Sequence, residues 1–139
     1  MTTQAHLKKL TQLRQDDATA LFAAKRYSGA YYISGLAVEC GIKVIIAHQF
    51  KGNRIPDKTL VVQTYSHDLK KLIALAGLVN ARDNELNVNF AFFDYWNVVK
   101  DWNINCRYNP IVSKIKARDM LQAINDATDG VISWLRRRW

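Results

Sequence analysis

The sequence predicts an all-α protein, an antiparallel up-and-down bundle of four long helices plus a shorter one. Of its 139 residues, 49% are hydrophobic, which is enough for one domain with a substantial core. The chain has only two prolines and six glycines, and both prolines fall between apolar-periodic stretches. Within those stretches, apolar residues recur near the 3.6-residue period of a helix. We therefore expect residues 1–139 to form a single helical domain.

The first two predicted helices occupy residues 3–25 and 30–48. The first is amphipathic, with charged and amide side chains between its apolar positions. The turn that follows offers Ser28 as an N-cap and Gly29 as a residue that can adopt a left-handed conformation. The second helix is apolar on nearly every face, so we expect other helices to surround it. Its small residues would let neighbouring backbones approach closely: Ser34, Gly35, Ala37 and Gly41.

Glu39 is the acidic residue within this apolar helix. It precedes Lys43 by four residues, a spacing that favours an ion pair along the helix. A charged acid on such an apolar helix can also face a polar pocket. The sequence leaves both interpretations of Glu39 open.

The shorter helix is predicted after the longest loop, which spans residues 49–66. Ser66 is the expected N-cap of this helix, which runs to about Ala76. Asp68 lies in its first turn, where a negative charge is favourable. We assign His67 to the same capping arrangement rather than to a catalytic site.

Two further helices complete the predicted bundle. Residues 84–103 form an aromatic-rich helix, whose rings we assign to core packing rather than to a base-stacking platform. Residues 104–110 break the pattern, and Pro110 should open the last helix at its first turn. The last helix runs from Ile111 toward the C-terminus, where three arginines complement the negative end of the helix dipole: Arg136, Arg137 and Arg138.

The charge balance favours an anionic partner. The chain has 20 lysines and arginines against 12 acidic residues, a formal net charge of +8. Basic surfaces bind polyanions because they release condensed counterions, so nucleic acid is the leading partner class. The sequence has no apolar signal segment and no run of about eighteen apolar residues, so we expect a cytoplasmic protein with no membrane partner.

Motifs for metal, cofactor or hydrolytic chemistry are missing from the sequence. It contains no phosphate loop, paired-cysteine zinc site or dinucleotide fingerprint, and its three histidines lie on separate predicted elements. Cys40 and Cys106 lack metal-ligand spacing and are expected to be buried thiols. We therefore expect no metal, no cofactor and no hydrolytic triad.

The most unusual polar cluster spans residues 102–110, just before the last predicted helix. It combines Arg107, Tyr108 and several asparagines. Because a helix N-terminus presents unpaired backbone N–H groups, these side chains could bind a phosphate there. A polar connection between helices is the equally weighted alternative.

Several of these segments, in their order along the chain, resemble the HEPN-domain proteins of prokaryotes. Residues 25–43 are a tyrosine-rich entry into an apolar helix with Val-Glu-Cys at its centre, residues 67–69 read His-Asp-Leu, and residues 102–108 end in Arg-Tyr. The resemblance covers nearly the whole chain. It implies a helical bundle, often a homodimer, that acts on RNA in toxin–antitoxin or anti-phage systems.

HEPN proteins that cleave RNA use an Arg-x4-6-His motif near the start of the last helix. In this chain, Arg107 and its polar neighbour Asn109 match the arginine side of that motif. The histidine is missing, because its allowed positions hold Val112, Ser113 and Lys114. Lys114 can at most stabilise charge, since the ordinary pKa of lysine is too high for proton transfer near neutral pH. The sequence thus leaves catalysis open.

The resemblance implies an RNA- or nucleotide-binding site, with three of its residues also candidates for catalysis: Arg107, Tyr108 and Lys114. Asn109 and Glu39 complete the expected binding set. One alternative function is a protein-interaction subunit that partners a nucleotidyltransferase, an antitoxin or another defence protein. The other is a variant metal-independent ribonuclease, in which His67, Tyr108 or Lys114 replaces the missing histidine.

Overall fold

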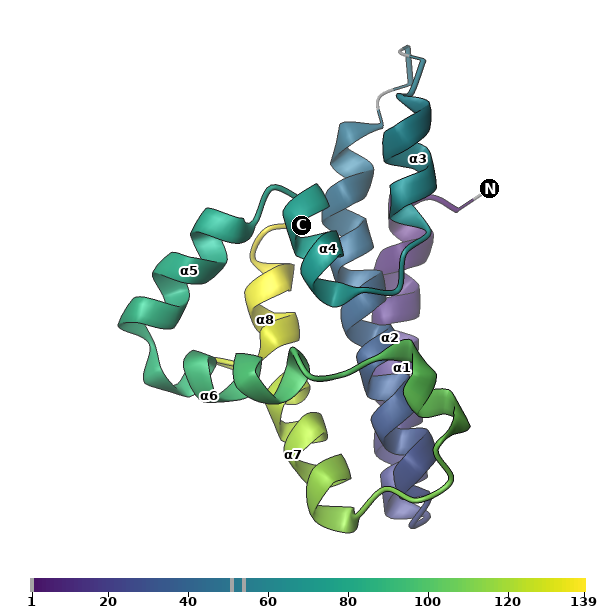
Figure 1. The fold of residues 1–139 in the computed structure, drawn as a ribbon, viewed down its shortest axis with the longest axis vertical. Coiled ribbons are helices and arrows are strands. Elements are labelled where there is room, and N and C mark those ends of the chain that lie inside the picture. The colour runs from purple at the N-terminus through teal and green to yellow at the C-terminus, as the bar shows by residue number, and fades with distance from the viewer. Residues whose placement is uncertain (1, 51, 54) are drawn as a thin grey trace.

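A computed structural model describes residues 2–50, 52–53 and 55–139, and this part of the chain is entirely helical and without strands (Figure 1). The predicted all-α bundle is confirmed. In the described residues there are eight α-helices and two short 3₁₀-helices, where the sequence predicted five helices. They are α1 Gln4–Ala23, α2 Tyr27–Ile46, η1 Ala47–Gln49, α3 Lys58–Thr64, α4 Leu69–Leu75, α5 Val79–Val88, α6 Phe90–Val99, η2 Ile104–Tyr108, α7 Lys114–Asn125 and α8 Val131–Arg136.

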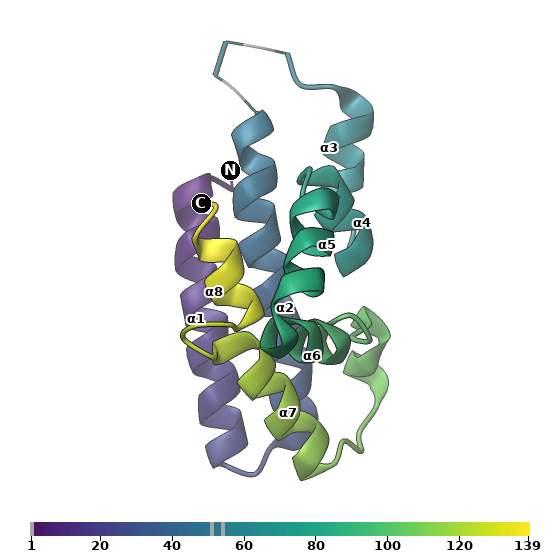
Figure 2. The same cartoon turned by 90° about the vertical axis from the view of Figure 1, so that its left-hand side faces the viewer.

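Helix α2 is the centre of the fold, as its apolar sequence predicts. Twelve of its 20 residues are buried. Helix α1 lies alongside it, and α4, α7, α8 and η2 pack on its other sides (Figures 1 and 2). The segment Tyr27–Gln49 is long and apolar enough to cross a membrane, but 67% of its most apolar window is buried inside the bundle. Its hydrophobicity is thus accounted for by packing against the other helices.

Two glycines of α2 allow the close approaches that its small residues predict. A Cβ atom added to Gly35 would lie 1.9 Å from Cε2 of Trp102, so this indole ring lies directly on the backbone of α2. A Cβ added to Gly41 would lie 3.2 Å from Cδ1 of Leu135, where α8 approaches. The segment after α6 and the C-terminal helix are therefore both seated on glycines of the central helix.

The turn between α1 and α2 forms differently from the prediction. Lys25, not Gly29, adopts the left-handed conformation, with φ of 61°. The N–H of Lys25 donates to the carbonyl of Phe22 (3.0 Å) and that of Arg26 to the carbonyl of Leu21 (2.8 Å). These bonds close a Schellman motif at the end of α1. Gly29 lies inside α2, and Ser28 is not its N-cap.

The predicted loop over residues 49–66 contains a helix, α3. Asp57 caps it by accepting hydrogen bonds from the backbone N–H groups of Thr59 (2.8 Å) and Leu60 (3.2 Å). The predicted cap of the next helix is also wrong, because Asp68 rather than Ser66 caps α4. The Ser66 hydroxyl instead accepts a hydrogen bond from the N–H of Asp68 (3.1 Å).

The predicted helix over residues 84–103 is two helices, α5 and α6, which meet at Asn89. The side-chain oxygen of Asn89 caps α6 by accepting from the N–H of Phe92 (3.1 Å). Its amide group donates to Glu85 and to Asp129, both at 2.9 Å. The aromatic prediction holds in part: Phe92 and Trp96 are buried in the core, whereas Phe90 and Phe93 are 84% and 45% exposed.

The last predicted helix is also two helices, α7 and α8, which the segment 126–130 separates. Asp126 accepts hydrogen bonds there from the backbone N–H groups of Thr128 (3.0 Å) and Asp129 (2.8 Å). At its other end, α7 begins behind Ser113, whose hydroxyl accepts from the N–H of Lys116 (3.1 Å). Pro110 therefore precedes the helix by four residues and does not open its first turn.

Candidate functional site

Glu39 is buried in the middle of α2 and contacts the side chains of Lys43 and His67. Its Oε2 atom accepts a hydrogen bond from Nζ of Lys43 (3.1 Å), which confirms the ion pair that their spacing predicts. Its Oε1 atom lies 2.7 Å from Nδ1 of His67. The Glu39 side chain is only 9% exposed, whereas the His67 side chain is 47% exposed. The carboxylate is thus a buried anchor for a surface histidine.

The prediction that His67 belongs to the helix cap is wrong. Asp68 alone caps α4, through its bonds to the N–H groups of Lys70 (3.0 Å) and Lys71 (3.2 Å). The His67 side chain instead meets Glu39 of α2. Because Nδ1 meets the carboxylate of Glu39, Nε2 is the ring nitrogen left to meet a ligand. A carboxylate that orients an imidazole in this way is the arrangement of a general base and its positioning residue.

A cavity of about 360 Å³ lies beside His67. Its wall comes from the start of α4 and from the segment that links α6 to η2. It carries two lysines and two aspartates, together with His67 and uncharged side chains: His67, Asp68, Leu69, Lys70, Lys100, Asp101, Trp102, Asn103 and Ile104. The sequence did not reveal this cavity, because its two segments lie about thirty residues apart; the His-Asp-Leu motif was the available signal.

The 3₁₀-helix η2 is held against the first half of α2. Trp102 precedes it and rests on Gly35, and Tyr31 of α2 lies under Nζ of Lys116 at 4.9 Å from the ring centroid. Burial, followed by the nearby Cys106 and Asp101, raises the pKa of Tyr31 to about 12. Tyr31 is therefore a neutral packing residue at physiological pH.

Four of the five predicted site residues lie on the surface, between the end of η2 and the start of α7. Arg107 and Tyr108 end η2, Asn109 follows them, and Lys114 is the first residue of α7. All four are exposed, and the Tyr108 side chain reaches 73% exposure. The guanidinium carbon of Arg107 lies 4.7 Å from the centroid of the Tyr108 ring, and no described acidic side chain pairs with Arg107. The arginine and the ring thus form an exposed cation–aromatic pair.

Glu39 makes no direct polar contact with these surface residues in the part of the chain that the structure describes. No hydrogen bond or ion pair among the described residues joins Glu39 to Arg107, Tyr108, Asn109 or Lys114, and Glu39 is instead committed to Lys43 and His67. Two features can therefore be distinguished. One is the buried Glu39 with its histidine, and the other is the exposed basic segment of residues 107–114.

The thiols and the possible metal ligands add no further chemistry to these features. Cys40 and Cys106 are free and half-buried, and burial raises the pKa of both thiols, so they remain protonated near neutral pH. In the described part of the chain, no three His, Cys, Asp or Glu side chains lie together in a way that could hold a metal ion.

The fold and these features define a small basic helical bundle with a carboxylate-bound histidine and an exposed arginine–tyrosine pair. Comparison with protein-family models, with characterised proteins and with solved structures finds no match to this chain.

Proposed function

We propose that this chain is a HEPN-like domain that binds RNA or nucleotides through the surface of Arg107, Tyr108, Asn109 and Lys114. The observation that carries the proposal is the exposed pair of Arg107 and Tyr108. An exposed aromatic ring offers a face on which a base can stack, worth about 1–3 kcal/mol per base. An arginine beside the ring adds a cation for the adjoining phosphate.

The charge of the surrounding segment supports an anionic ligand. Residues 102–118 contain no acidic residue and four cations: Arg107, Lys114, Lys116 and Arg118. Lys114 and Lys116 form no ion pair with the described residues, and Arg118 meets Asp119 only at 3.5 Å. Such an uncompensated segment attracts a phosphate backbone, at an affinity that falls as salt rises.

A second candidate function is a variant metal-independent ribonuclease, which the contact between His67 and Glu39 favours. The missing motif histidine would be replaced by His67, with its Nε2 atom as the general base and Glu39 as the positioning residue. This candidate requires RNA to reach the cavity beside His67 as well as the Arg107 surface.

The resemblance to HEPN proteins supports the remaining parts of the proposal. These are a cytoplasmic homodimer and a place in a toxin–antitoxin or anti-phage system, with an antitoxin or a nucleotidyltransferase as a possible protein partner. Ile111 and Ile115 adjoin the basic surface and are 82% and 61% exposed. Exposed apolar side chains of this size are what a second copy or another protein would cover.

The experiment that tests both functions is incubation of purified protein with labelled total RNA at physiological salt. Retention and cleavage are scored together for wild type, Arg107→Ala, His67→Ala and the charge-matched control Lys9→Ala on α1. Retention that Arg107→Ala weakens and Lys9→Ala does not is the expected result. Cleavage by wild type and by Lys9→Ala that His67→Ala abolishes would establish the ribonuclease. Equal retention by all four proteins would refute the Arg107 surface.

A further inference from the structure

Helix α3 is one of the two α-helices of the described residues that have no buried residue; the other is α5. Its Val62 is 61% exposed. Tyr65, which ends the helix, is 76% exposed. A helix of seven residues is unstable in water unless something packs against it. The side of α3 that α4 leaves uncovered is therefore available for a partner.

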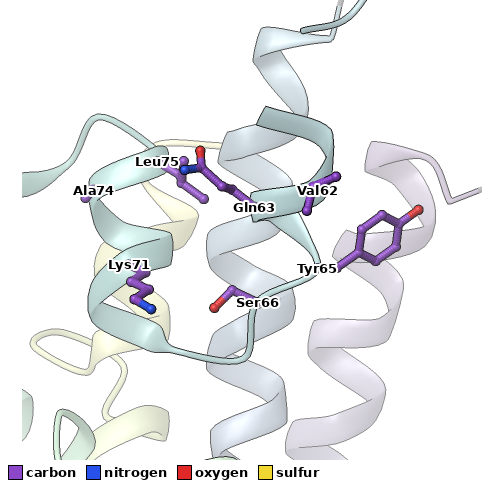
Figure 3. Close-up of a pocket in the computed structure, with 7 residues that line it drawn as sticks. All are labelled: Val62, Gln63, Tyr65, Ser66, Lys71, Ala74 and Leu75. Carbon is purple, nitrogen blue, oxygen red and sulfur yellow. The ribbon is translucent and has the colours of Figure 1, made fainter. Parts of the chain in front are cut away.

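A groove separates α3 from α4, with a volume of about 670 Å³. Figure 3 shows Gln63 extending from α3 toward Leu75 of α4, with Lys71 on α4 below it. The walls of the groove are mainly apolar and contain no acidic side chain: Val62, Gln63, Tyr65, Ser66, Lys71, Ala74 and Leu75. This volume lies in the range of pockets that enclose a few side chains or one small molecule.

The charge of the groove is that of Lys71 alone. Its side chain is exposed and makes no ion pair with the described residues. The acids nearest in sequence, Asp57 and Asp68, cap α3 and α4 and accept their hydrogen bonds from backbone N–H groups. A ligand that matches this groove would therefore present an apolar surface with a negative charge beside it.

We propose that the groove between α3 and α4 binds an acidic amphipathic helix of a partner protein. Apolar side chains of that helix, spaced at i, i+3 or i+4 and i+7, enter between Val62 and Leu75, and a carboxylate meets Lys71. RNA is the less favoured occupant, because the walls are mainly apolar and carry a single cation, Lys71, for a phosphate. The site also lies apart from the proposed RNA surface, since α3 and the start of α7 lie toward opposite ends of the long axis (Figures 1 and 2).

The test uses a fluorescent peptide of about 15 residues, close to the shortest length that forms an isolated helix. It carries leucines at i, i+3 and i+7 and glutamates beside them. One twin has lysines in place of the glutamates, and another has a central proline. Anisotropy titrations compare wild type, Lys71→Glu and Val62→Asp with two controls away from the groove, Lys114→Glu and Val88→Asp.

The acidic peptide should bind wild type, and the proline peptide should bind at least about tenfold more weakly. Lys71→Glu should lower the affinity for the acidic peptide by at least about fivefold and raise the affinity for the lysine peptide. Val62→Asp should weaken both helical peptides, while Lys114→Glu and Val88→Asp leave them unchanged. No binding of the acidic peptide would overturn the proposal. Equal losses in Lys71→Glu and Lys114→Glu would also overturn it, because they would show attraction to net charge alone.

Discussion

Replacing Gly35 with alanine should destabilise the protein strongly, although alanine is the better helix former. The added Cβ atom would lie 1.9 Å from Cε2 of Trp102 and 2.1 Å from its Nε1. An ordinary contact begins at 3.4 Å, so the indole ring would have to retreat by about 1.5 Å. Trp102 is only 4% exposed, and the cavity beside His67, which it lines, is a space into which the ring could shift.

The magnitude follows from what the ring would lose. A tryptophan buries about 150–250 Å². At about 25 cal/mol per Å², its full expulsion would cost about 4–6 kcal/mol. A partial shift of the ring with some movement of the backbone costs about 1–3 kcal/mol, as overpacking usually does. Since alanine returns about 0.5–1 kcal/mol of helix propensity, we expect a net loss of about 1 kcal/mol if the ring only shifts and about 4 kcal/mol if it is expelled.

Gly29→Ala is the matched control, because it makes the same change in the same helix. A Cβ atom at Gly29 would lie 3.4 Å from Cδ1 of Leu21, which is an ordinary contact. This variant should gain up to about 1 kcal/mol. Urea denaturation followed by circular dichroism measures both variants, and a lower midpoint at unchanged slope reports the loss of stability.

A Gly35→Ala variant as stable as wild type would refute the seating of Trp102 on α2. A double variant of Gly35→Ala and Trp102→Leu provides a second check. Because leucine removes the ring that clashes, the double variant should lose less stability than the sum of the losses in the two single variants. Additive losses would show that Gly35 and Trp102 do not act on each other.

The remaining predictions concern titration and the buried carboxylate. Burial raises the pKa of Tyr31 to about 12, so the neutral ring contributes its full stabilisation of the fold below pH 10. As the pH rises from 10 to 12, the protein should lose about 2–3 kcal/mol of its free energy of unfolding. Over that pH range the denaturation midpoint of Tyr31→Phe should fall less than that of wild type. Equal falls in the two proteins would contradict this prediction. Backbone hydrogen bonds lower the pKa of Asp126 from 3.8, so its carboxylate stabilises the fold above that pH, and this stabilisation is lost as the pH falls through the lowered pKa. The stability of Asp126→Asn should therefore fall less steeply in acid than that of wild type. The same dependence of stability on pH in both proteins would contradict this prediction. Glu39→Gln should lower the free energy of unfolding by about 1–3 kcal/mol, because it leaves Lys43 without its carboxylate. The control Asp17→Asn, at the exposed pair with Arg14, should lower it by less than about 1 kcal/mol. Equal losses in urea denaturation would contradict the role of Glu39 as a buried anchor.

Features with a local cause could be predicted from the sequence. The near-continuous apolar composition of α2 predicts its central place, because such a helix must be covered on all sides. The spacing of Glu39 and Lys43 predicts their ion pair, because residues four apart face each other on a helix. The small residues of α2 predict close packing, although not which side chain lies on which glycine.

The helix breaks were missed because apolar periodicity continues through them. Asn89 and Asp126 end their helices by bonding backbone N–H groups, and an asparagine or aspartate competes in this way whether or not the apolar pattern stops. Asn89 is also held by Asp129, 40 residues away. A contact of that range leaves no local pattern in the sequence.

The contact between His67 and Glu39 could not be predicted for the same reason. The two residues lie 28 positions apart and meet only because α4 packs on α2. The sequence did identify each of them, as an acid on an apolar helix and as the start of a His-Asp-Leu motif. The packing of the two helices brings the imidazole and the carboxylate together.

The measurement that tests the proposed function most directly is the affinity for single-stranded RNA at several salt concentrations. Wild type is compared by fluorescence anisotropy with Arg107→Ala, Tyr108→Ala and the control Lys9→Ala. We predict that Arg107→Ala and Tyr108→Ala each weaken binding by about fivefold or more, and that Lys9→Ala has little effect. Arg107→Ala should also reduce the salt slope by about 0.7, the value for one phosphate contact on a single strand. Equal affinities and equal slopes for all four proteins would contradict the assignment of this surface to RNA.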